Sequence, residues 1–351
     1  MESQKLIFAI GNPLLDISAE CEESVLTEYG LQNGLACLAE EKHKGLFEML
    51  WTKENWERIP GGAAMNTIRT ANFMLKGQYE NSCLYFGSIW EDERGEILKK
   101  SLEDDKIMHD FSIATDTYTG ACAVVINNKE RALCADLAAC LKYNMEHLES
   151  NMDRLADFKI LYTTGFFITS NLEALKKVAQ YATDNDKTFA FNISAVFLLD
   201  LYKADYEEIL QHADIVFGNE DEIDKFGAAF GLESKERASI AEYIAKYPKK
   251  SSGPRTVIAH QGTLPWITSI YDHAKDEVQT KENEFDVLPQ AEVVDLNSAG
   301  DSFAGGYLAA IAMGHSHETA LKAAFYGARY IIQASGCSFP KPCEFEYPDI
   351  S

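Results

Sequence analysis

A run of small residues around Asp301 is the part of this sequence whose residue types best suit chemistry. It reads Asp295-Leu296-Asn297-Ser298-Ala299-Gly300-Asp301 and leads from a strand-like stretch, 291–294, into an apolar helix. Small side chains at a helix start let an anion approach free backbone N–H groups. A carboxylate there repels the anion, unless it takes a proton from a hydroxyl that attacks the anion. The run therefore indicates phosphoryl transfer to an alcohol, with Asp301 as general base and an anion hole at 298–301. An ordinary capped helix with an acidic first turn is the alternative.

Paired glycines precede a second expected helix start. Gly61 and Gly62 stand shortly before Asn66, which opens a helix predicted over 66–76. Glycine permits close backbone contact with a ligand, and an Asn side chain can both donate and accept. The segment therefore predicts a ligand contact, and a plain loop with a helix cap is the alternative.

Polar residues also follow two of the expected strands. Asn12 and Asp16 come after the first strand, and an amide and a carboxylate suit the vicinal hydroxyls of a sugar. Glu220-Asp221-Glu222 comes after a later strand, and clustered acids beside a phosphate site suit Mg²⁺, which keeps most of its waters. The alternatives are a simple turn at Pro13 and a solvated acidic helix start.

The elements that position these segments alternate between strands and helices. Runs rich in Val, Ile, Phe and Tyr predict strands, and the stretches between them carry apolar residues at helical spacing. This alternation predicts an α/β fold with a mainly parallel sheet, whose ligands bind at the carboxyl ends of the strands. The expected strands are 6–10, 83–89, 159–164, 188–193, 213–217 and 256–259, and the expected helices are 66–76, 94–104, 172–185, 234–246, 300–313 and 318–334.

Two regions interrupt the alternation and predict a separate small domain. In one of them, strand-like 121–126 and 131–135 are joined by Asn127-Asn128-Lys129-Glu130, which suits a turn because Asn tolerates positive φ. We expect the two regions to pair as a lid over the ligand edge of the large sheet. The lid then comprises 17–60 and 118–141, and the large domain comprises 1–16, 61–117 and 142–351.

The composition excludes several classes of protein. The 351 residues are 46% apolar and carry a formal net charge of −23. This composition supplies a large globular core, whereas the charge repels phosphate backbones and anionic lipid. We therefore expect neither a nucleic acid nor a membrane as partner. No apolar run reaches the ~18 residues of a spanning helix, and the first residues lack the features of a signal peptide.

The cysteine and histidine spacing predicts neither disulfides nor a metal site. The eight cysteines form no CxxC pair, so we expect free thiols and a cytoplasmic protein, with nuclear entry left open. The sequon at Asn192 lies in an apolar run and is expected to be a buried strand. His315-Ser316-His317 lacks a third ligand and is interpreted as a surface turn. No GxxxxGK[ST], GxGxxG or HExxH motif occurs.

Seven segments, taken together, resemble the ribokinase-like carbohydrate kinase family. They are GNPLLD at 11–16, PGGAAMN at 60–66, YTGAC at 118–122, GNEDE at 218–222, HQG at 260–262, DLNSAGDSFAGG at 295–306 and GCSFP at 336–340. The resemblance runs from about residue 6 to residue 340. It implies a ribokinase-like three-layer α/β core with a small α/β lid. It also implies transfer of the ATP γ-phosphate to the 5′-hydroxyl of adenosine, with Mg²⁺ as cofactor, and we expect a monomer.

The resemblance assigns roles around the transferred phosphate. Asp301 matches the catalytic base, and Ser298, Ala299 and Gly300 match the anion hole. Arg131 resembles a lid cation that meets the phosphates on closure, a plain surface charge being the alternative. Asn219 and Glu222 match an NxxE element, in which Glu222 organises Mg²⁺ through water. The positions implied at ATP are Asn219, His260, Gly262, Ser298, Gly300 and Phe339.

The resemblance also assigns residues to the nucleoside. Asp16 resembles the ligand of the ribose hydroxyls, and a purine base needs apolar and aromatic faces. Core packing is the alternative for the two aromatic residues, Phe167 and Phe197. The positions implied at the nucleoside are Asn12, Leu14, Asp16, Ala36, Gly61, Gly62, Ala63, Asn66, Cys122, Leu133, Ala135, Leu137, Phe167, Phe197 and Asn297.

Three positions depart from the family pattern. Leu296 replaces a Thr, Ser298 replaces a Gly, and Ala63 stands where a Ser is common. We expect these changes to bear on affinity and specificity more than on reaction type. The remaining alternatives are another sugar or nucleoside kinase of this fold and a catalytically inactive nucleoside-binding protein.

Overall fold

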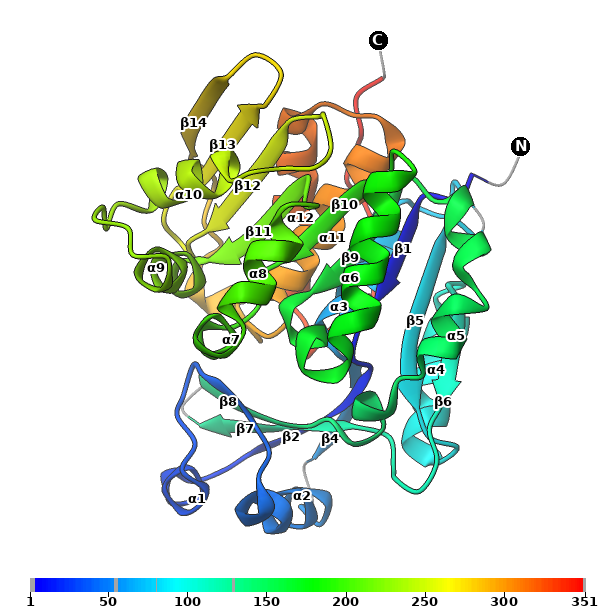
Figure 1. The fold of residues 1–351 in the computed structure, drawn as a ribbon. Helices are drawn as coiled ribbons and strands as arrows, with labels where there is room; N and C mark the ends of the chain where they lie inside the picture. The colour runs from blue at the N-terminus through cyan, green and yellow to red at the C-terminus, as the bar shows by residue number, and fades with distance from the viewer. Residues whose placement is uncertain (1–3, 54–55, 80, 128–129, 350–351) are drawn as a thin grey trace.

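A computed structural model describes residues 4–53, 56–79, 81–127 and 130–349, which form two sheets of unequal size (Figure 1). The large sheet has nine strands in the order β14-β13-β12-β11-β10-β9-β1-β5-β6. Pairing is parallel from β6 to β12, and β13 and β14 complete the edge in antiparallel pairing. The strands are β1 (Ile7–Ile10), β5 (Cys83–Ile89), β6 (Met108–Ile113), β9 (Ile160–Thr164), β10 (Thr188–Asn192), β11 (Ile215–Asn219), β12 (Arg255–His260), β13 (Trp266–Asp272) and β14 (Glu277–Asn283).

Helices cover both faces of the large sheet, because successive strand residues point to opposite sides. Phe8 and Ile10 of β1 join the core under one helical layer, whereas Ile7 and Ala9 join the core under the other. The first layer contains α5 (Met145–Glu149), α6 (Ile168–Asp184), α7 (Val196–Leu201), α8 (Lys203–Leu210), α9 (Glu220–Ala229) and α10 (Arg237–Lys246). The second contains α3 (Ala63–Met74), α4 (Glu93–Asp104), α11 (Ala299–Met313) and α12 (His317–Ile331).

Gly305 and Gly306 let the helices of the second layer approach one another. A Cβ at Gly305 would lie 2.4 Å from the carbonyl oxygen of Thr67 in α3, and one at Gly306 would lie 2.5 Å from that of Ala323 in α12. The glycine pair in the middle of α11 is therefore explained by close packing between helices.

The small sheet lies beside the carboxyl ends of the large sheet's parallel strands and has the order β3-β8-β7-β2-β4 (Figure 1). The polypeptide enters it directly from β1. Helices α1 (Glu23–Tyr29) and α2 (Lys44–Trp51) cover its outer face. Its strands are β2 (Leu14–Glu20), β3 (Ala36–Leu38), β4 (Glu57–Gly61), β7 (Ala121–Asn127) and β8 (Glu130–Asp136). We call this unit the lid.

The structure agrees with most expected elements and corrects several. The lid sheet takes in residues 14–16 and Gly61, which lie just outside the expected lid boundaries. The strand expected at 291–294 is wrong, since the chain forms a 3-10 turn at Gln290–Glu292 and then runs without regular structure. Strands β7 and β8 pair as the expected hairpin, and residues 128–129 of its turn lie outside the described residues. The other 3-10 turns are Glu41–His43, Ala138–Lys142, Met152–Asp157 and Gly165–Phe167.

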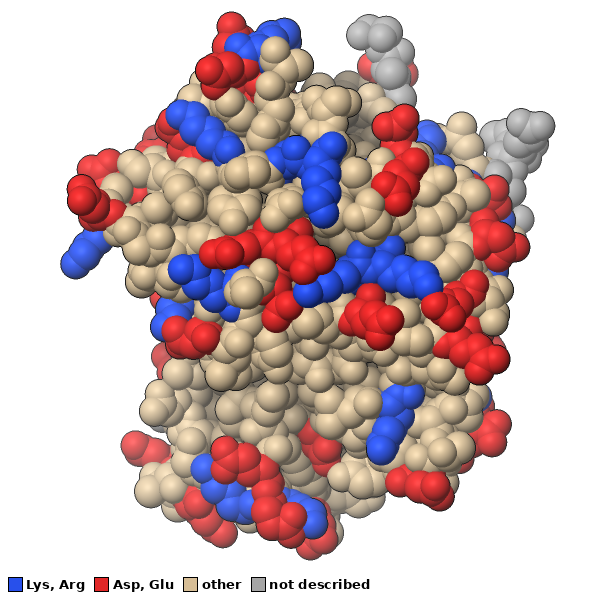
Figure 2. All heavy atoms as spheres, viewed as in Figure 1, with Lys and Arg blue, Asp and Glu red and all other residues tan. Residues whose placement is uncertain are grey.

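The surface charges, the cysteines and the helices agree with the expectations from the sequence or extend them. On the face drawn in Figure 2, basic side chains lie beside acidic ones. Among the ion pairs of the structure, Lys176 contacts both Asp205 and Glu208. All eight cysteines are free, and Asn192 of the sequon is buried at the end of β10. None of the helices in the described ranges has the length and apolar character needed to cross a membrane.

Candidate active site

The start of α11 presents free backbone donors beside a carboxylate. Ser298 is the N-cap, and its side chain caps none of the first amides. Because the first N–H groups of a helix have no partner within the helix, those of Gly300 and Asp301 remain available to an anion. The other two expected donors are engaged, since Ser298 N–H donates to Asn297 Oδ1 at 3.1 Å and Ala299 N–H approaches the Leu296 oxygen at 3.4 Å. The anion hole in this structure therefore offers two free N–H donors, those of Gly300 and Asp301, instead of the four expected from residues 298–301.

The backbone conformation at Ser298 favours glycine, the residue that the family resemblance implies at this position. The φ of Ser298 is +64°, in the left-handed region that disfavours a side chain, and its Oγ accepts a hydrogen bond from Asn66 Nδ2 at 2.9 Å. At this position the hydrogen bond to the serine hydroxyl stabilises the structure, whereas the positive φ of the serine destabilises it.

Two substitutions separate the strain at Ser298 from its hydrogen bond. Both Ser298→Gly and Ser298→Ala remove the hydroxyl, but only glycine relieves the positive φ. We expect the glycine variant to have a free energy of unfolding higher than that of the alanine variant by about 1 kcal/mol. Urea unfolding measures the difference, and equal stability of the two variants would contradict the strain argument.

Asp301 lies in the first turn of α11, and its Oδ2 accepts a hydrogen bond from Asn66 Nδ2 at 3.1 Å. Burial raises the pKa of Asp301 to about 7, an increase that the bond from Asn66 only partly offsets. The pKa of Asp301 therefore lies well above the ordinary aspartate value of ~3.9, which would leave the group fully charged at neutral pH. At neutral pH the carboxyl group exchanges its proton readily, as a general base must.

Asp16 faces the same region from β2 of the lid. Its Oδ2 accepts a hydrogen bond from Asn297 Nδ2 at 3.3 Å, and Gly61 leaves room for its carboxyl group, which a Cβ would approach to 2.6 Å. Burial raises the pKa of Asp16 to about 7, and the negative charge of Asp301 raises it further, whereas the hydrogen bond from Asn297 lowers it. Two buried carboxyl groups thus share one site.

Two buried amide oxygens in the site accept no hydrogen bond from the described residues. Asn12 Oδ1 and Asn66 Oδ1 have no hydrogen-bond partner among the described residues, although Asn12 Nδ2 donates to the Phe166 oxygen at 3.1 Å. Gly62 allows this close arrangement with its φ of +98°, since a Cβ there would lie 2.1 Å from the Asn12 oxygen. Its neighbour Ala63 begins α3. Buried acceptors without donors are rare in proteins, and the hydroxyl groups of a ligand would satisfy them.

One face of the lid sheet supplies an apolar wall. The residues expected around the purine gather there in one cluster: Leu14, Cys122, Leu133, Ala135 and Leu137. Ala36 pairs with Leu133 across β3 and β8. Phe197 of α7 remains partly exposed. Phe167 is only 1% exposed and contacts Tyr143 within the large core, so core packing, the alternative interpretation, describes it better.

Arg131 links the lid to the large domain. Its Nε lies 2.5 Å from Oδ1 of Asp295, whose side chain is 1% exposed. Asp295 also accepts hydrogen bonds from the backbone N–H groups of Asn297 and Gly336, both at 2.7 Å. Arg131 is therefore not a plain surface charge. The ion pair with Asp295 holds Arg131 next to the 295–301 run. No role had been expected for Asp295 from the sequence.

Asn219 and Glu222 form a reciprocal cap at the start of α9. Glu222 accepts from Asn219 N–H at 3.0 Å and from Asn219 Nδ2 at 2.9 Å, and the Glu222 N–H donates to Asn219 Oδ1 at 2.8 Å. Burial raises the pKa of Glu222 to about 7, and the charge of Asp301 raises it further. Glu222 is thus buried, not solvated. Burial disfavours the ionised form of Glu222, and a hydrated cation nearby would stabilise that form by offsetting its negative charge. The environment of Glu222 therefore suits a cation site.

An aromatic-lined cleft lies beside Trp266, whose ring contacts Phe303 of α11. His260 ends β12, and a Cβ at Gly300 would lie 3.3 Å from its ring. Burial lowers the pKa of His260 to about 4, so the ring is neutral at neutral pH. Trp266 contacts the ring of Phe303 at 4.3 Å and lines a cleft of about 900 Å³ with Phe285, Phe325, Tyr326, Arg329 and Tyr330, among others.

None of the six residues expected at ATP is among those that line this cleft, and the remaining two, Gly262 and Phe339, lie near it. Gly262 is exposed, and its carbonyl oxygen accepts from Trp266 Nε1 at 3.3 Å. Phe339 stacks on Phe73 at 4.6 Å and contacts Tyr330, which does line the cleft. The residues that line the cleft were not predicted from the sequence. Four of its aromatic residues come from three segments, namely β13 (Trp266), the chain after β14 (Phe285) and α12 (Phe325 and Tyr330), and only the fold brings them together.

The chain belongs to the pfkB family of carbohydrate kinases. The pattern described as "pfkB family carbohydrate kinase" matches residues 35–343. The resemblance stated from the seven segments is therefore confirmed, as is the α/β fold class.

Individual relatives are similar over nearly the whole chain. Adenosine kinase 2 of Arabidopsis thaliana is 34% identical over 343 residues, covering 97% of each protein, and adenosine kinase of Dictyostelium discoideum is 34% identical over 337 residues, covering 95% of this chain and 96% of the other. Among solved structures, Anopheles gambiae adenosine kinase in complex with P1,P4-di(adenosine-5) tetraphosphate superposes with a TM-score of 0.90 at 34% identity, covering 97% of this chain and 99% of the other.

Proposed function

We propose that this protein transfers the γ-phosphate of ATP to the 5′-hydroxyl of adenosine, giving AMP and ADP. The observation that carries the proposal is the placement of Asp301, whose carboxyl group lies at the uncapped start of α11 and is held by Asn66. A base beside free amide donors is what phosphoryl transfer to an alcohol requires. Whole-chain similarity to proteins named adenosine kinase supports adenosine as the acceptor.

The nucleoside is expected to bind between the lid and the start of α11. Asp16 accepts hydrogen bonds from the ribose hydroxyls, and the free amide oxygens of Asn12 and Asn66 accept others. The base lies against the apolar cluster that contains Leu14 and Leu133. A wall of this kind suits a purine better than a free sugar, which needs more polar partners.

ATP is expected to approach α11 from the opposite side. The cleft of about 900 Å³ beside Trp266 is large enough for a nucleotide, and its aromatic residues suit the adenine base. Trp266 on its wall contacts Phe303, two residues beyond Asp301. We therefore expect the phosphate chain of ATP to extend from the cleft toward the amides of Gly300 and Asp301. The two substrates then meet at the start of α11.

The chain's own residues account for most of the transfer. Asp301 accepts the proton of the 5′-hydroxyl as that oxygen attacks the γ-phosphorus, and the amides of Gly300 and Asp301 stabilise the charge on the phosphoryl oxygens. Arg131 reaches a phosphate only after leaving Asp295, and lid closure excludes competing water. Mg²⁺, when bound with ATP, would neutralise phosphate charge, with Glu222 holding its water shell.

The proposed oligomeric state and location follow from other observations. All the residues of the proposed site belong to one chain, so we propose that a monomer is active. The eight cysteines are free thiols, which supports a cytoplasmic location.

The activity is expected to depend on pH in the neutral range. The pKa of Asp301 and that of Asp16 are both raised to about 7 by burial, so each group gains its charge as the pH rises through that value. Since the base must be ionised before it accepts a proton, kcat/KM for adenosine should rise with pH and level off above about 7. A pH–rate profile tests this, and full activity down to about pH 5, as for an ordinary aspartate, would contradict it.

A nucleoside panel tests the proposed function. With Mg-ATP present, adenosine should give AMP and ADP at a rate orders of magnitude above those for inosine, guanosine and ribose, and mass spectrometry identifies the product. Preference for a sugar or another nucleoside would point to a different kinase of this fold. Adenosine binding without ADP release would point to an inactive nucleoside-binding protein.

A further inference from the structure

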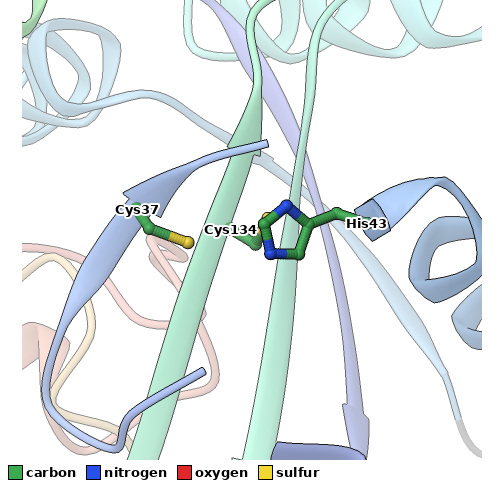
Figure 3. A group of neighbouring side chains, drawn as sticks. All are labelled: Cys37, His43 and Cys134. Atoms are coloured by element: carbon green, nitrogen blue, oxygen red, sulfur yellow. The ribbon is translucent and has the colours of Figure 1, made fainter. Parts of the chain in front are cut away.

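Two cysteines of the lid face each other across neighbouring strands. Cys37 of β3 pairs in parallel register with Cys134 of β8, and their sulfur atoms, with a ring nitrogen of His43, all lie within 4.8 Å of one another. Figure 3 shows the Cys37 side chain pointing toward Cys134 and the His43 ring. Neighbouring strands are separated by about 4.8 Å, within the range of Cα separations that a disulfide spans. The backbone therefore already meets the main requirement for a bond between these sulfurs.

The two ring nitrogens of His43 are occupied by the backbone. Nδ1 accepts from Glu40 N–H at 2.8 Å, closing the cap of the 3-10 turn, and Nε2 lies 3.1 Å from the Tyr29 oxygen, to which it donates. A metal ion could bind this ring only by displacing one of these bonds. The cluster is therefore better described as a pair of thiols beside a structural histidine than as a metal site.

The pair differs in access and in acidity. Cys134 is fully buried, whereas Cys37 is only half-buried. Cys134 hydrogen-bonds to Cys37, which lowers the pKa of the Cys37 thiol and raises that of Cys134. Cys37 thus has the properties of an attacking thiol, and Cys134 those of a second thiol that is reached only through the first.

We propose that Cys37 and Cys134 react reversibly with small disulfides such as oxidised glutathione. The reaction joins the two cysteines by a disulfide bond within the lid. The Cys37 thiolate attacks one sulfur of the small disulfide and releases the other half as a thiol, which leaves a mixed disulfide on Cys37. Cys134 then gives up its proton, attacks the Cys37 sulfur and expels the second half as a thiol. Two protein thiols are oxidised in this exchange, and one small disulfide is reduced to two small thiols.

The bond would fasten an edge strand of the lid. Strand β3 has three residues and pairs only with β8 in the lid sheet as described. The two sulfurs lie on the face covered by α1 and α2, whereas Leu38, Leu133 and Ala135 of the same strands belong to the apolar wall on the other face. Oxidation therefore fixes the strand that carries part of this wall, and the chemistry of the pair does not rest on the proposed function.

Oxidised glutathione tests the proposal on the full chain. After incubation and blocking of free thiols, peptide mapping by mass spectrometry should find the Cys37 peptide linked to the Cys134 peptide, with two fewer free thiols per chain, and dithiothreitol should reverse the change. Cys134→Ser should stop at a glutathione adduct on Cys37, and Cys37→Ser should leave Cys134 unmodified. Cys343→Ser, which removes another half-buried thiol outside the lid, should form the link as the natural chain does.

The result on the natural chain decides the proposal even if a variant folds poorly. Absence of the linked peptide, or a stable glutathione adduct on Cys37 with no link, would overturn it. Reaction of Cys134 at an undiminished rate in Cys37→Ser would overturn the assigned order of attack. Retention of one equivalent of added Zn²⁺ by the natural chain, with loss in Cys37→Ser, would overturn it in favour of a metal site.

Discussion

Replacing Asp301 by Asn is expected to lower kcat for adenosine phosphorylation by at least ~10²-fold, the range for loss of a general base. Asparagine keeps the shape of the side chain and can keep a hydrogen bond with Asn66, but it cannot accept the proton of the 5′-hydroxyl. Because binding contacts are retained, KM for adenosine should change much less than kcat. Glu23→Gln, which removes an exposed first-turn carboxylate from α1, serves as the matched control and should keep full turnover.

The same variant is expected to gain stability, which separates loss of the base from misfolding. The pKa of Asp301 is about 7 in the folded protein, raised from an ordinary value of 3.8. As the pH rises between these values, the unfolded chain releases this proton while the folded chain retains it, so wild type loses stability. The asparagine side chain does not titrate, so ligand-free Asp301→Asn should unfold at a higher temperature than wild type above about pH 7. Near-full turnover, or a lower unfolding temperature at that pH, would contradict the assignment.

Local patterns predicted the residues of the site better than its electrostatics. The small-residue run at 295–301 and the glycine pair before Asn66 were found separately in the sequence, and the fold joins them through Asn66, which donates to both Ser298 and Asp301. The raised pKa of Asp301 was not predictable from its own neighbours in sequence. It follows from burial, which depends on packing of α3 against α11.

Errors in the sequence analysis have identifiable physical causes. The stretch 291–294 is apolar enough for a strand, but it crosses from the sheet to α11, and Val294 is 62% exposed. Phe166 and Phe167 are adjacent in sequence, and only the phase of the 3-10 turn at Gly165–Phe167 decides which ring enters the core. Strand β14 was missed because its residues are mostly polar and exposed, as edge strands often are.

Contacts between the lid and the large domain were beyond sequence reasoning. The ion pair of Arg131 with Asp295 joins positions far apart in the chain, and neither residue has a local pattern that specifies the other. The pairing of Cys37 with Cys134 was hidden for the same reason, since no CxxC spacing marks it. Such contacts depend on the strand order of the lid, which composition and periodicity do not determine.

Replacing Asp16 by Ala is expected to raise KM for adenosine by about 10- to 100-fold. The carboxylate is proposed to accept hydrogen bonds from the ribose, and bonds to a charged group contribute about 1.5–3 kcal/mol, with tenfold in affinity for each 1.4 kcal/mol. Asp16 lies on β2, away from the cleft proposed for ATP, so KM for ATP should stay within about twofold. Glu20→Ala, at the exposed end of the same strand, is the matched control and should leave both constants unchanged.

The kinetic pattern of Asp16→Ala distinguishes ribose binding from a structural role. Removal of a buried carboxyl group whose pKa is raised to about 7 should not destabilise the ligand-free protein above that pH, because folding no longer requires burial of its charge. A retained unfolding temperature with a raised KM for adenosine would place the loss at the nucleoside. An unchanged KM for adenosine, or an equal rise in KM for both substrates, would show that Asp16 does not bind the ribose. Saturating adenosine should restore much of the rate in the variant, since Asp301 and the α11 amides are untouched.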